Sequence, residues 1–197
     1  DLLVLDKPSG LLAVPGKGPD LQDCLSARVQ RMYPQALIVH RLDRDTSGLI
    51  VMALNTKAQR ELSIQFANRT VEKRYLAVAF GYPDAMEGLI DLPLRKDFEH
   101  PPRHRVDPVA GKPARTFWRL LERESDRCRL ELKPETGRSH QIRVHLAEQG
   151  HPILGDNLYA HAEALAMAPR LMLHAERLVL TQPLTGERLS FHADCPF

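Results

Sequence analysis

The hydrophobic pattern of the chain predicts strands and helices in mixed order. Short apolar runs bounded by Gly, Pro, Asn or charged residues are typical of strands. In residues 129–133 the leucines alternate with charged residues, which indicates a strand with one face in water. The predicted strands cover residues 2–6, 36–39, 49–54, 75–80, 114–121, 129–133, 177–181 and 188–192, and the last two are expected to form a hairpin.

Helices are predicted where apolar residues recur every three to four positions after a capping residue. We expect Asp20 and Ser139 each to cap a helix, and Thr56 to cap another with the help of Gln59. The buried face of the first helix is predicted to consist of Leu21, Leu25, Val29 and Met32. The predicted helices cover residues 21–33, 57–67, 140–149 and 162–167.

These elements predict an α+β fold with a mixed, largely antiparallel central sheet flanked by helices and loops. The 197 residues are enough for one domain with a sizeable core, and we expect a single domain over 1–197. Residues 97–113 contain four prolines and several charges, which predicts a long exposed loop with a weak hairpin. Because the chain opens on Asp1 rather than Met, we expect further residues before it in the native protein.

The composition is that of an ordinary globular protein, with 43% hydrophobic and 26% charged residues. No apolar run reaches the ~18 residues of a membrane span, and the start lacks a signal-peptide pattern. Cys24, Cys128 and Cys195 are far apart, which fits a reducing cytosol rather than a disulfide framework. The spacing of His140 and His145 is unlike a zinc motif. We therefore expect a cytoplasmic protein with no metal and no membrane association.

Positive charge is concentrated in one part of the chain. The net charge is only +2, but residues 95–143 contain 13 Lys and Arg against 8 Asp and Glu, which leaves +5. Clustered positive charge is the usual footprint of phosphate binding. A solvated basic loop would have the same composition, so charge alone leaves both interpretations open.

Candidate chemistry lies in residues 40–48, which read HRLDRDTSG and lead into an apolar run. Asp43 is flanked by Arg41 and Arg44, so its ionised form should be favoured. An ionised carboxylate at the start of a buried strand is a candidate nucleophile or base. The alternative is that Asp43 and Asp45 cap a turn and pair with surface arginines.

The same segment resembles a signature of the RluA-type RNA pseudouridine synthases. A second signature of that family is similar to residues 137–145, which read GRSHQIRVH, and the two segments stand in the family's order. The resemblance covers the whole chain. Further agreement is found at residues 7–10 (KPSG), 73–76 (KRYL), 111–114 (GKPA), 151–156 (HPILGD) and 168–171 (APRL).

The resemblance implies the pseudouridine synthase fold and an isomerisation of uridine that needs no cofactor. The base is detached from its sugar, turned, and rejoined through C5. Asp43 is the family's catalytic aspartate, Arg143 pairs with it, and Tyr75 stacks on the target base and helps to remove the C5 proton. From the local pattern alone, Arg143 is a surface helix charge and Tyr75 a half-buried core residue.

The resemblance also implies that the target base is flipped out of its stem-loop. Arg41 fills the gap in the stack, and Ile142 packs against the uracil. The alternatives are that Arg41 pairs with a neighbouring aspartate and that Ile142 is simply core. Arg138 and His140 are expected to bind phosphates near the start of a helix.

The implied partner is structured RNA, either large-subunit ribosomal RNA, a tRNA anticodon stem-loop or both, bound by a monomer. Candidate contacts to the RNA backbone are Arg103, Arg105, Lys112 and Arg115.

Two other functions remain open. One is a magnesium-dependent nuclease with Asp43 and Asp45 as ligands, which would lose activity in EDTA. The other is a non-catalytic RNA-binding module, which would keep its function in Asp43→Asn.

Overall fold

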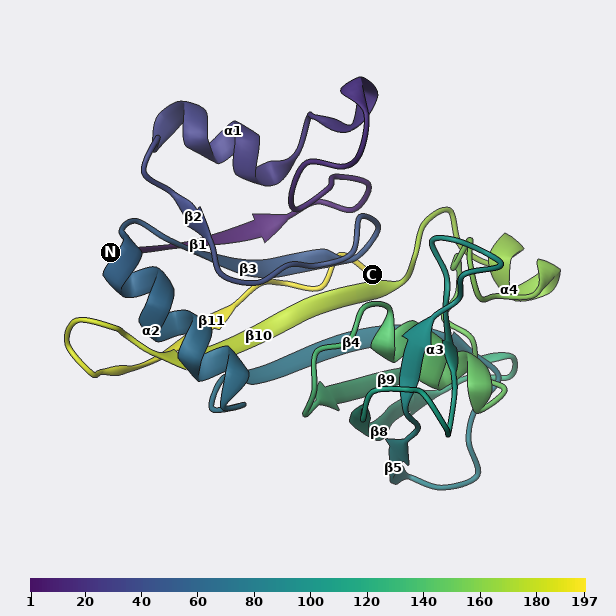
Figure 1. Ribbon diagram of the computed structural model, residues 1–197. Coiled ribbons are helices and arrows are strands. Elements are labelled where there is room, and N and C mark those ends of the chain that lie inside the picture. Colours follow the sequence, from purple (N-terminus) through teal and green to yellow (C-terminus); the bar gives the residue numbers. More distant parts are fainter. The chain divides into compact units, whose positions relative to one another are not determined.

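The computed structural model describes residues 1–197 and contains two compact units, each built from strands and helices (Figure 1). Unit 1 comprises Asp1–Lys73 and His174–Pro196, and unit 2 comprises Arg74–Leu173 with Phe197. The predicted α+β class is confirmed in both. No helix has the length and apolar character needed to cross a bilayer.

The sheet of unit 1 is mixed. β3 (Ser47–Ala53) pairs antiparallel with β1 (Leu2–Lys7) and β2 (Leu37–Ile38), and parallel with β10 (Leu173–Thr181). β10 pairs antiparallel with β11 (Arg188–His192), which confirms the predicted hairpin. Every residue of β3 is buried, because sheet neighbours and helix α2 surround it.

Two helices and a 3-10 turn complete unit 1. α2 (Thr56–Ala67) packs on β3 through Ala58 and Leu62. The predicted cap of this helix was wrong by one position: the Asn55 side chain accepts the hydrogen bond from the Ala58 amide at 2.8 Å. Asn and Thr are both good N-caps, so the sequence alone does not show which of Asn55 and Thr56 caps the helix.

The first predicted helix was also wrong in its extent. Residues Pro19–Leu21 form a 3-10 turn, and α1 (Leu25–Met32) begins later with Cys24 as its N-cap. Met32 is 76% exposed, and Leu21 is largely exposed as well. Only two members of the predicted apolar face, Leu25 and Val29, are buried.

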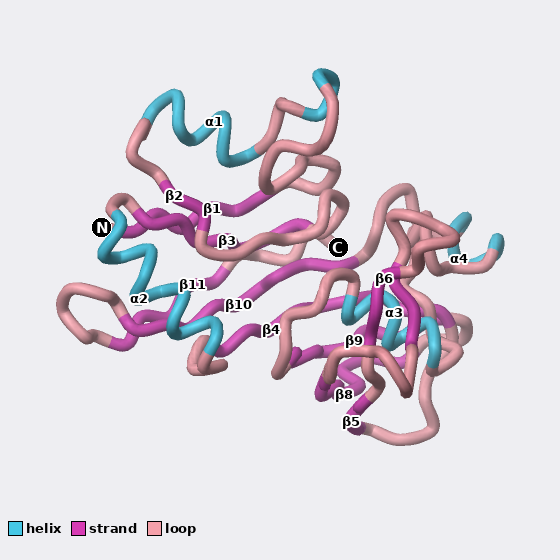
Figure 2. Tube along the Cα trace, in the orientation of Figure 1, coloured by secondary structure: helices cyan, strands magenta, loops and turns pink.

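Unit 2 contains a sheet of order β4-β9-β8-β5, whose strands all pair antiparallel, and a separate β6–β7 hairpin (Figure 2). The second strand of this hairpin lies within the long loop predicted at residues 97–113, and the first strand precedes that loop. Helix α3 packs on β7, β8 and β9. The elements are β4 (Glu72–Phe80), β5 (Glu87–Asp91), β6 (Leu94–Lys96), β7 (His104–Val106), β8 (Arg115–Arg123), β9 (Arg127–Pro134), α3 (Gln141–Glu148) and α4 (Ala162–Ala166).

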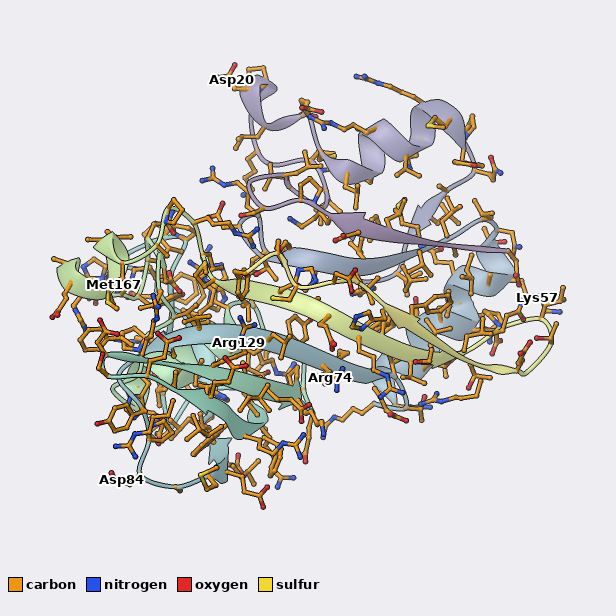
Figure 3. All side chains as sticks on the ribbon, turned by 180° about the vertical axis from the view of Figure 1, so that it is seen from behind. Asp20, Lys57, Arg74, Asp84, Arg129 and Met167 are labelled. Carbon is orange, nitrogen blue, oxygen red and sulfur yellow. The ribbon has the colours of Figure 1, made fainter.

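The two faces of this sheet differ, as the alternation in residues 129–133 predicts. Leu130 and Leu132 face the apolar cluster that includes residues of α3. On the other face the carboxylate of Glu131 forms ion pairs with Lys133 at 3.0 Å, Arg119 at 3.1 Å and Arg74 at 3.3 Å. Burial alone would raise the pKa of Glu131, but these three cations lower it. Figure 3 shows the model from behind and labels Arg74 on this face.

His40 holds the chain where it enters the loop that carries Asp43. Its ring stacks on Phe66 of α2 with centroids 4.4 Å apart, and its Nε2 accepts a hydrogen bond from the Val51 amide of β3 at 3.0 Å. Burial, assisted by the charge of Lys73, lowers the pKa of His40 to about 3. The ring is therefore neutral in the folded protein at pH 5–7.

Gly48 is required by the parallel pairing of β3 and β10. It has φ 108°, and a Cβ there would overlap the backbone oxygen of Ala175 and lie 2.6 Å from its nitrogen. Gly48→Ala should therefore lower the free energy of unfolding by about 3 kcal/mol or more, measured by urea denaturation. Gly186→Ala is the matched control, since Gly186 has φ 75° but open space around it, and should cost about 1 kcal/mol. Equal losses in the two variants would contradict this explanation.

The partly buried, neutral His40 predicts an acid-sensitive fold. Between pH 6.5 and 3 the unfolded chain binds a proton at His40 that the folded chain does not, so stability falls as pH falls. From pH 7 to pH 5 this residue should cost about 2 kcal/mol of unfolding free energy. His40→Gln keeps a hydrogen-bond acceptor without a titrating ring, and urea unfolding at both pH values should show a smaller loss in that variant. The same pH dependence in both proteins would contradict the assignment.

Candidate active site

The loop between β2 and β3 carries Asp43, which is partly exposed. Leu42 beside it is buried, whereas Arg41 and Arg44 are exposed. Arg44 pairs with Asp45 at 3.1 Å, as the turn interpretation predicts for that aspartate. The structure therefore places an aspartate on a loop that is anchored at both ends, by His40 and by the buried strand β3.

A buried lysine fixes this loop from the side. The Lys7 ammonium is inaccessible to solvent and donates to the carbonyls of Pro8 at 2.9 Å, Leu11 at 2.8 Å and Arg44 at 2.8 Å. The Ser9 hydroxyl also donates to the Asp45 carbonyl at 2.7 Å. The KPSG segment thus binds the backbone on the C-terminal side of Asp43. Three carbonyls offset much of the cost of removing the ammonium from water.

Tyr75 and Ile142 belong to one apolar cluster of unit 2. Ile142 on α3 is buried in the cluster, and Tyr75 on β4 packs against it while remaining partly exposed. Because successive strand residues face opposite sides, Arg74 points instead toward Glu131. The local prediction that Tyr75 is a half-buried core residue is confirmed, and its partial exposure also allows contact with a ligand.

Arg143 is buried, so the interpretation as a surface helix charge is wrong. Only 3% of its side chain is exposed. Its Nε donates to Oδ2 of Asp156 at 2.8 Å, and its Nη2 donates to Oδ1 at 2.7 Å. Asp156, whose side chain is fully buried, also accepts from the amides of Leu158 and Tyr159. Two short parallel bonds between buried charges fix the guanidinium in one orientation.

A tyrosine joins the start of α3 to the β6–β7 hairpin. The Tyr159 hydroxyl lies 2.6 Å from Nδ1 of His140 and accepts a hydrogen bond from the His104 amide at 2.8 Å. Its ring lies 5.2 Å from the Arg143 guanidinium carbon and 5.3 Å from that of Arg103. Three of the predicted site residues, His140, Arg143 and Arg103, are therefore gathered around one aromatic ring.

The predicted cap of α3 was wrong. His140, not Ser139, occupies the N-cap position, in the left-handed conformation with φ 57°. The Gln141 side chain organises the turn instead, accepting from the Arg138 amide at 3.0 Å and from the Thr136 hydroxyl at 2.6 Å. Such a backbone conformation is uncommon outside glycine.

The remaining basic candidates have different surroundings. Arg138 donates to the Pro113 carbonyl at 3.1 Å, and Arg105 lies 3.8 Å from Asp107. Lys112 is exposed and follows the β6–β7 hairpin. Arg115 forms two ion pairs, at 2.9 and 3.3 Å, that neutralise much of its charge. Among these, Arg115 therefore has the clearest structural role.

One group of side chains has its potential metal-ligand atoms within 4.8 Å of one another: Asp97, Glu99 and His100. Two of the three residues are exposed, and the His100 ring is 3.1 Å from Asp97. Exposed acidic groups of this kind are common without a metal, and we assign none to it.

Sequence reasoning missed Lys7, Asp156 and Tyr159 as residues that hold the site. Each lies in or beside a segment that resembles the family, and that resemblance was the available signal. Their roles depend on partners that only the folded chain brings together.

Comparisons with known proteins agree with the predicted family. The model of the family described as RNA pseudouridylate synthase matches residues 1–148. The dual-specificity RNA pseudouridine synthase RluA of Escherichia coli (strain K12) is 51% identical over 197 residues, which are 100% of this chain and 90% of the relative. The RluA protein of Haemophilus influenzae is 46% identical over the same shares of the two chains.

A solved structure agrees as well. Human RNA Pseudouridylate Synthase Domain Containing 1 has a TM-score of 0.82 and 29% identity, covering 100% of this chain and 81% of that chain. The predicted pseudouridine synthase fold is thereby confirmed. The chain belongs to the RNA pseudouridylate synthase family.

Proposed function

We propose that this enzyme isomerises specific uridines to pseudouridine in large-subunit ribosomal RNA, in a tRNA anticodon stem-loop or in both. The observation that carries the proposal is full-length similarity to relatives named as dual-specificity RNA pseudouridine synthases, at 46–51% identity. Both family signatures, residues 40–48 and 137–145, lie within the matched segment. Because the family match includes residues of both units, we treat residues 1–197 as one catalytic domain, acting as a monomer in the cytoplasm.

Asp43 is the catalytic carboxylate in this proposal, with Tyr75 and Arg143 as its catalytic partners. The anchored loop supports the role of Asp43, because a carboxylate on a fixed backbone needs little reorganisation to act as a nucleophile or base. The partial exposure of Tyr75 beside Ile142 supports stacking on a base. The reaction needs no redox step and no energy input, so we propose that it proceeds without a cofactor or metal.

The target uridine must leave its stack to be rearranged. We assign the vacated position to the Arg41 side chain, which is exposed and planar, and the uracil face to Ile142. Arg138 and His140 are the candidates for phosphates next to the flipped nucleotide. Further along the backbone, Arg103, Arg105 and Lys112 are stronger candidates than Arg115, whose two ion pairs compete for it.

Arg143 depends on Asp156 for its orientation. Without that carboxylate the guanidinium would be a buried charge without its bidentate partner. Asp156 is thus a positioning residue, and its loss should affect both stability and catalysis.

The function is tested by mapping pseudouridine in RNA from cells that lack this protein. At least one site in ribosomal RNA or tRNA should disappear and return with the unaltered gene. Asp43→Asn should fail to restore it and should lower kcat in vitro by about 10²-fold or more. Asp45→Asn, two residues away, should restore it. An unchanged set of pseudouridines in the deletion strain would refute the function. Loss of activity in both Asp43→Asn and Asp45→Asn, reproduced by adding EDTA to the unaltered protein, would favour the nuclease.

The role of Asp156 predicts a large difference between two similar ion pairs. Asp156→Asn should lower the unfolding free energy by about 3 kcal/mol, because it removes the negative charge that binds the buried Arg143 guanidinium through two short bonds. Arg28 and Asp23 form the same bidentate pair on the surface, at 2.8 and 2.6 Å, with more than half of each side chain exposed. Asp23→Asn should leave the urea midpoint almost unchanged. Similar losses in both variants would show that burial of the pair is unimportant.

A further inference from the structure

The β6–β7 hairpin is fixed at its base to helix α3. Leu94 of β6 is buried with Ala114 and with Val144 of α3, and Val106 and Tyr159 pack against them. The Leu94 amide donates to the Lys112 carbonyl at 2.9 Å, and the Tyr159 hydroxyl accepts from the hairpin amide of His104. The hairpin is therefore firmly attached beside the residues that hold Arg143.

Two aspartates order the turns of this segment. Asp97 accepts hydrogen bonds from the amides of Glu99 at 3.0 Å and His100 at 3.3 Å. Asp107 accepts from the Ala110 amide at 2.8 Å and pairs with Arg95 at 3.1 Å. The aspartate side chains are only 14% and 15% exposed, so their charge is directed into the turns.

The turn that Asp97 orders carries an exposed aromatic side chain with two cations beside it. Phe98 is 70% exposed. The Arg95 guanidinium carbon lies 5.8 Å from its ring centroid and the Lys96 ammonium lies 5.6 Å from it, both within the range of cation–π attraction. Glu99 is the one nearby acidic residue of the turn that is exposed. A single exposed phenylalanine needs no explanation, but one with two cations beside it on an ordered hairpin has a specific chemistry.

We propose that Phe98 is a stacking platform for an unpaired RNA base, with Lys96 and Arg95 placed for the adjoining phosphates. The inference rests on the proposed function, because it takes RNA as the partner. An exposed ring offers a π face that any base can stack on, and neighbouring cations attract the backbone that carries the base. Unpaired nucleotides, rather than the deep groove of an RNA helix, are what an aromatic side chain can reach.

The charge around the ring selects this occupant over a protein surface. A second copy of the chain would bring its own Arg95 and Lys96 against these cations, so self-association through Phe98 would place like charges together. An RNA strand brings one negative charge with every base it offers.

The test compares two RNA probes of equal length, an unstructured 12-nucleotide strand and a paired duplex, by fluorescence anisotropy. Phe98→Ala should weaken binding of the single strand about fivefold or more, and Phe98→Trp should retain it. Neither variant should change binding of the duplex by more than about twofold. Lys96→Gln should make the plot of log K against log salt concentration for single-strand binding less steep, by about the slope of one phosphate contact.

Val109→Ser is the matched control, because Val109 is an apolar residue of the same segment that is 95% exposed but has no aromatic ring on which a base could stack. It should bind both probes as the unaltered protein does. Equal affinity of Phe98→Ala and the unaltered protein for the single strand would overturn the inference, as would failure of the unaltered protein to bind that strand. Loss of a dimer in Phe98→Ala on sedimentation, with RNA binding intact, would overturn it in favour of a second copy.

The failure of this inference differs from failure of the proposed function. An unaltered protein that forms pseudouridine, together with a Phe98→Ala variant of unchanged affinity, would refute the stacking platform alone. An unaltered protein that forms no pseudouridine in any RNA would refute the proposed function. When the rate is measured over a range of stem-loop substrate concentrations, Phe98→Ala should keep the kcat of the unaltered protein and raise the KM, since the ring is assigned to binding.

Discussion

The buried ion pair between Arg143 and Asp156 is the interaction on which the structure around the start of helix α3 depends. Both charges are withdrawn from water, and their two short bonds, together with the backbone amides that donate to Asp156, offset part of that cost. The pair joins α3 to the chain segment that follows it, and it brings Tyr159 over the guanidinium. Through the Tyr159 hydroxyl, the same arrangement extends to His140 and to the β6–β7 hairpin. One carboxylate therefore orders a helix terminus, an aromatic contact and the base of the β6–β7 hairpin.

In unit 1 the loop that carries Asp43 is held by other interactions. The loop that carries Asp43 is held by a neutral ring, a buried ammonium and a glycine, at His40, Lys7 and Gly48. His40 supplies an acceptor for a backbone amide, and Lys7 supplies a donor for backbone carbonyls. Gly48 leaves room for the neighbouring strand β10. None of them uses the side chain of Arg41, which is exposed beside Asp43 and can reach a ligand.

The sequence predicted the strands and the family better than it predicted the helix ends and the contacts within the site. The buried run after Gly48 and the alternation at Leu130 and Leu132 are properties of the local pattern, and both were confirmed. Helix starts were misplaced because several neighbouring residues can cap, and because a cysteine, Cys24, is an unusual choice. The burial of Arg143 could not be inferred locally, since its partner lies thirteen residues further along, beyond the end of α3. The family resemblance includes the segments that contain Lys7, Arg143 and Asp156, but it does not show what each side chain contacts.

The parallel pairing of β3 with β10 also has a consequence for biosynthesis. Residues 47 and 48 of unit 1 find their partners at residues 174 and 175, so the sheet of that unit stays incomplete until the last part of the chain has left the ribosome. The strands and helices of unit 2 come almost entirely from the intervening stretch and can assemble earlier. Until then the apolar strand β3 lacks one neighbour and has an unpaired edge. The nascent enzyme is thus most prone to aggregation after its middle has folded and before its final strands emerge.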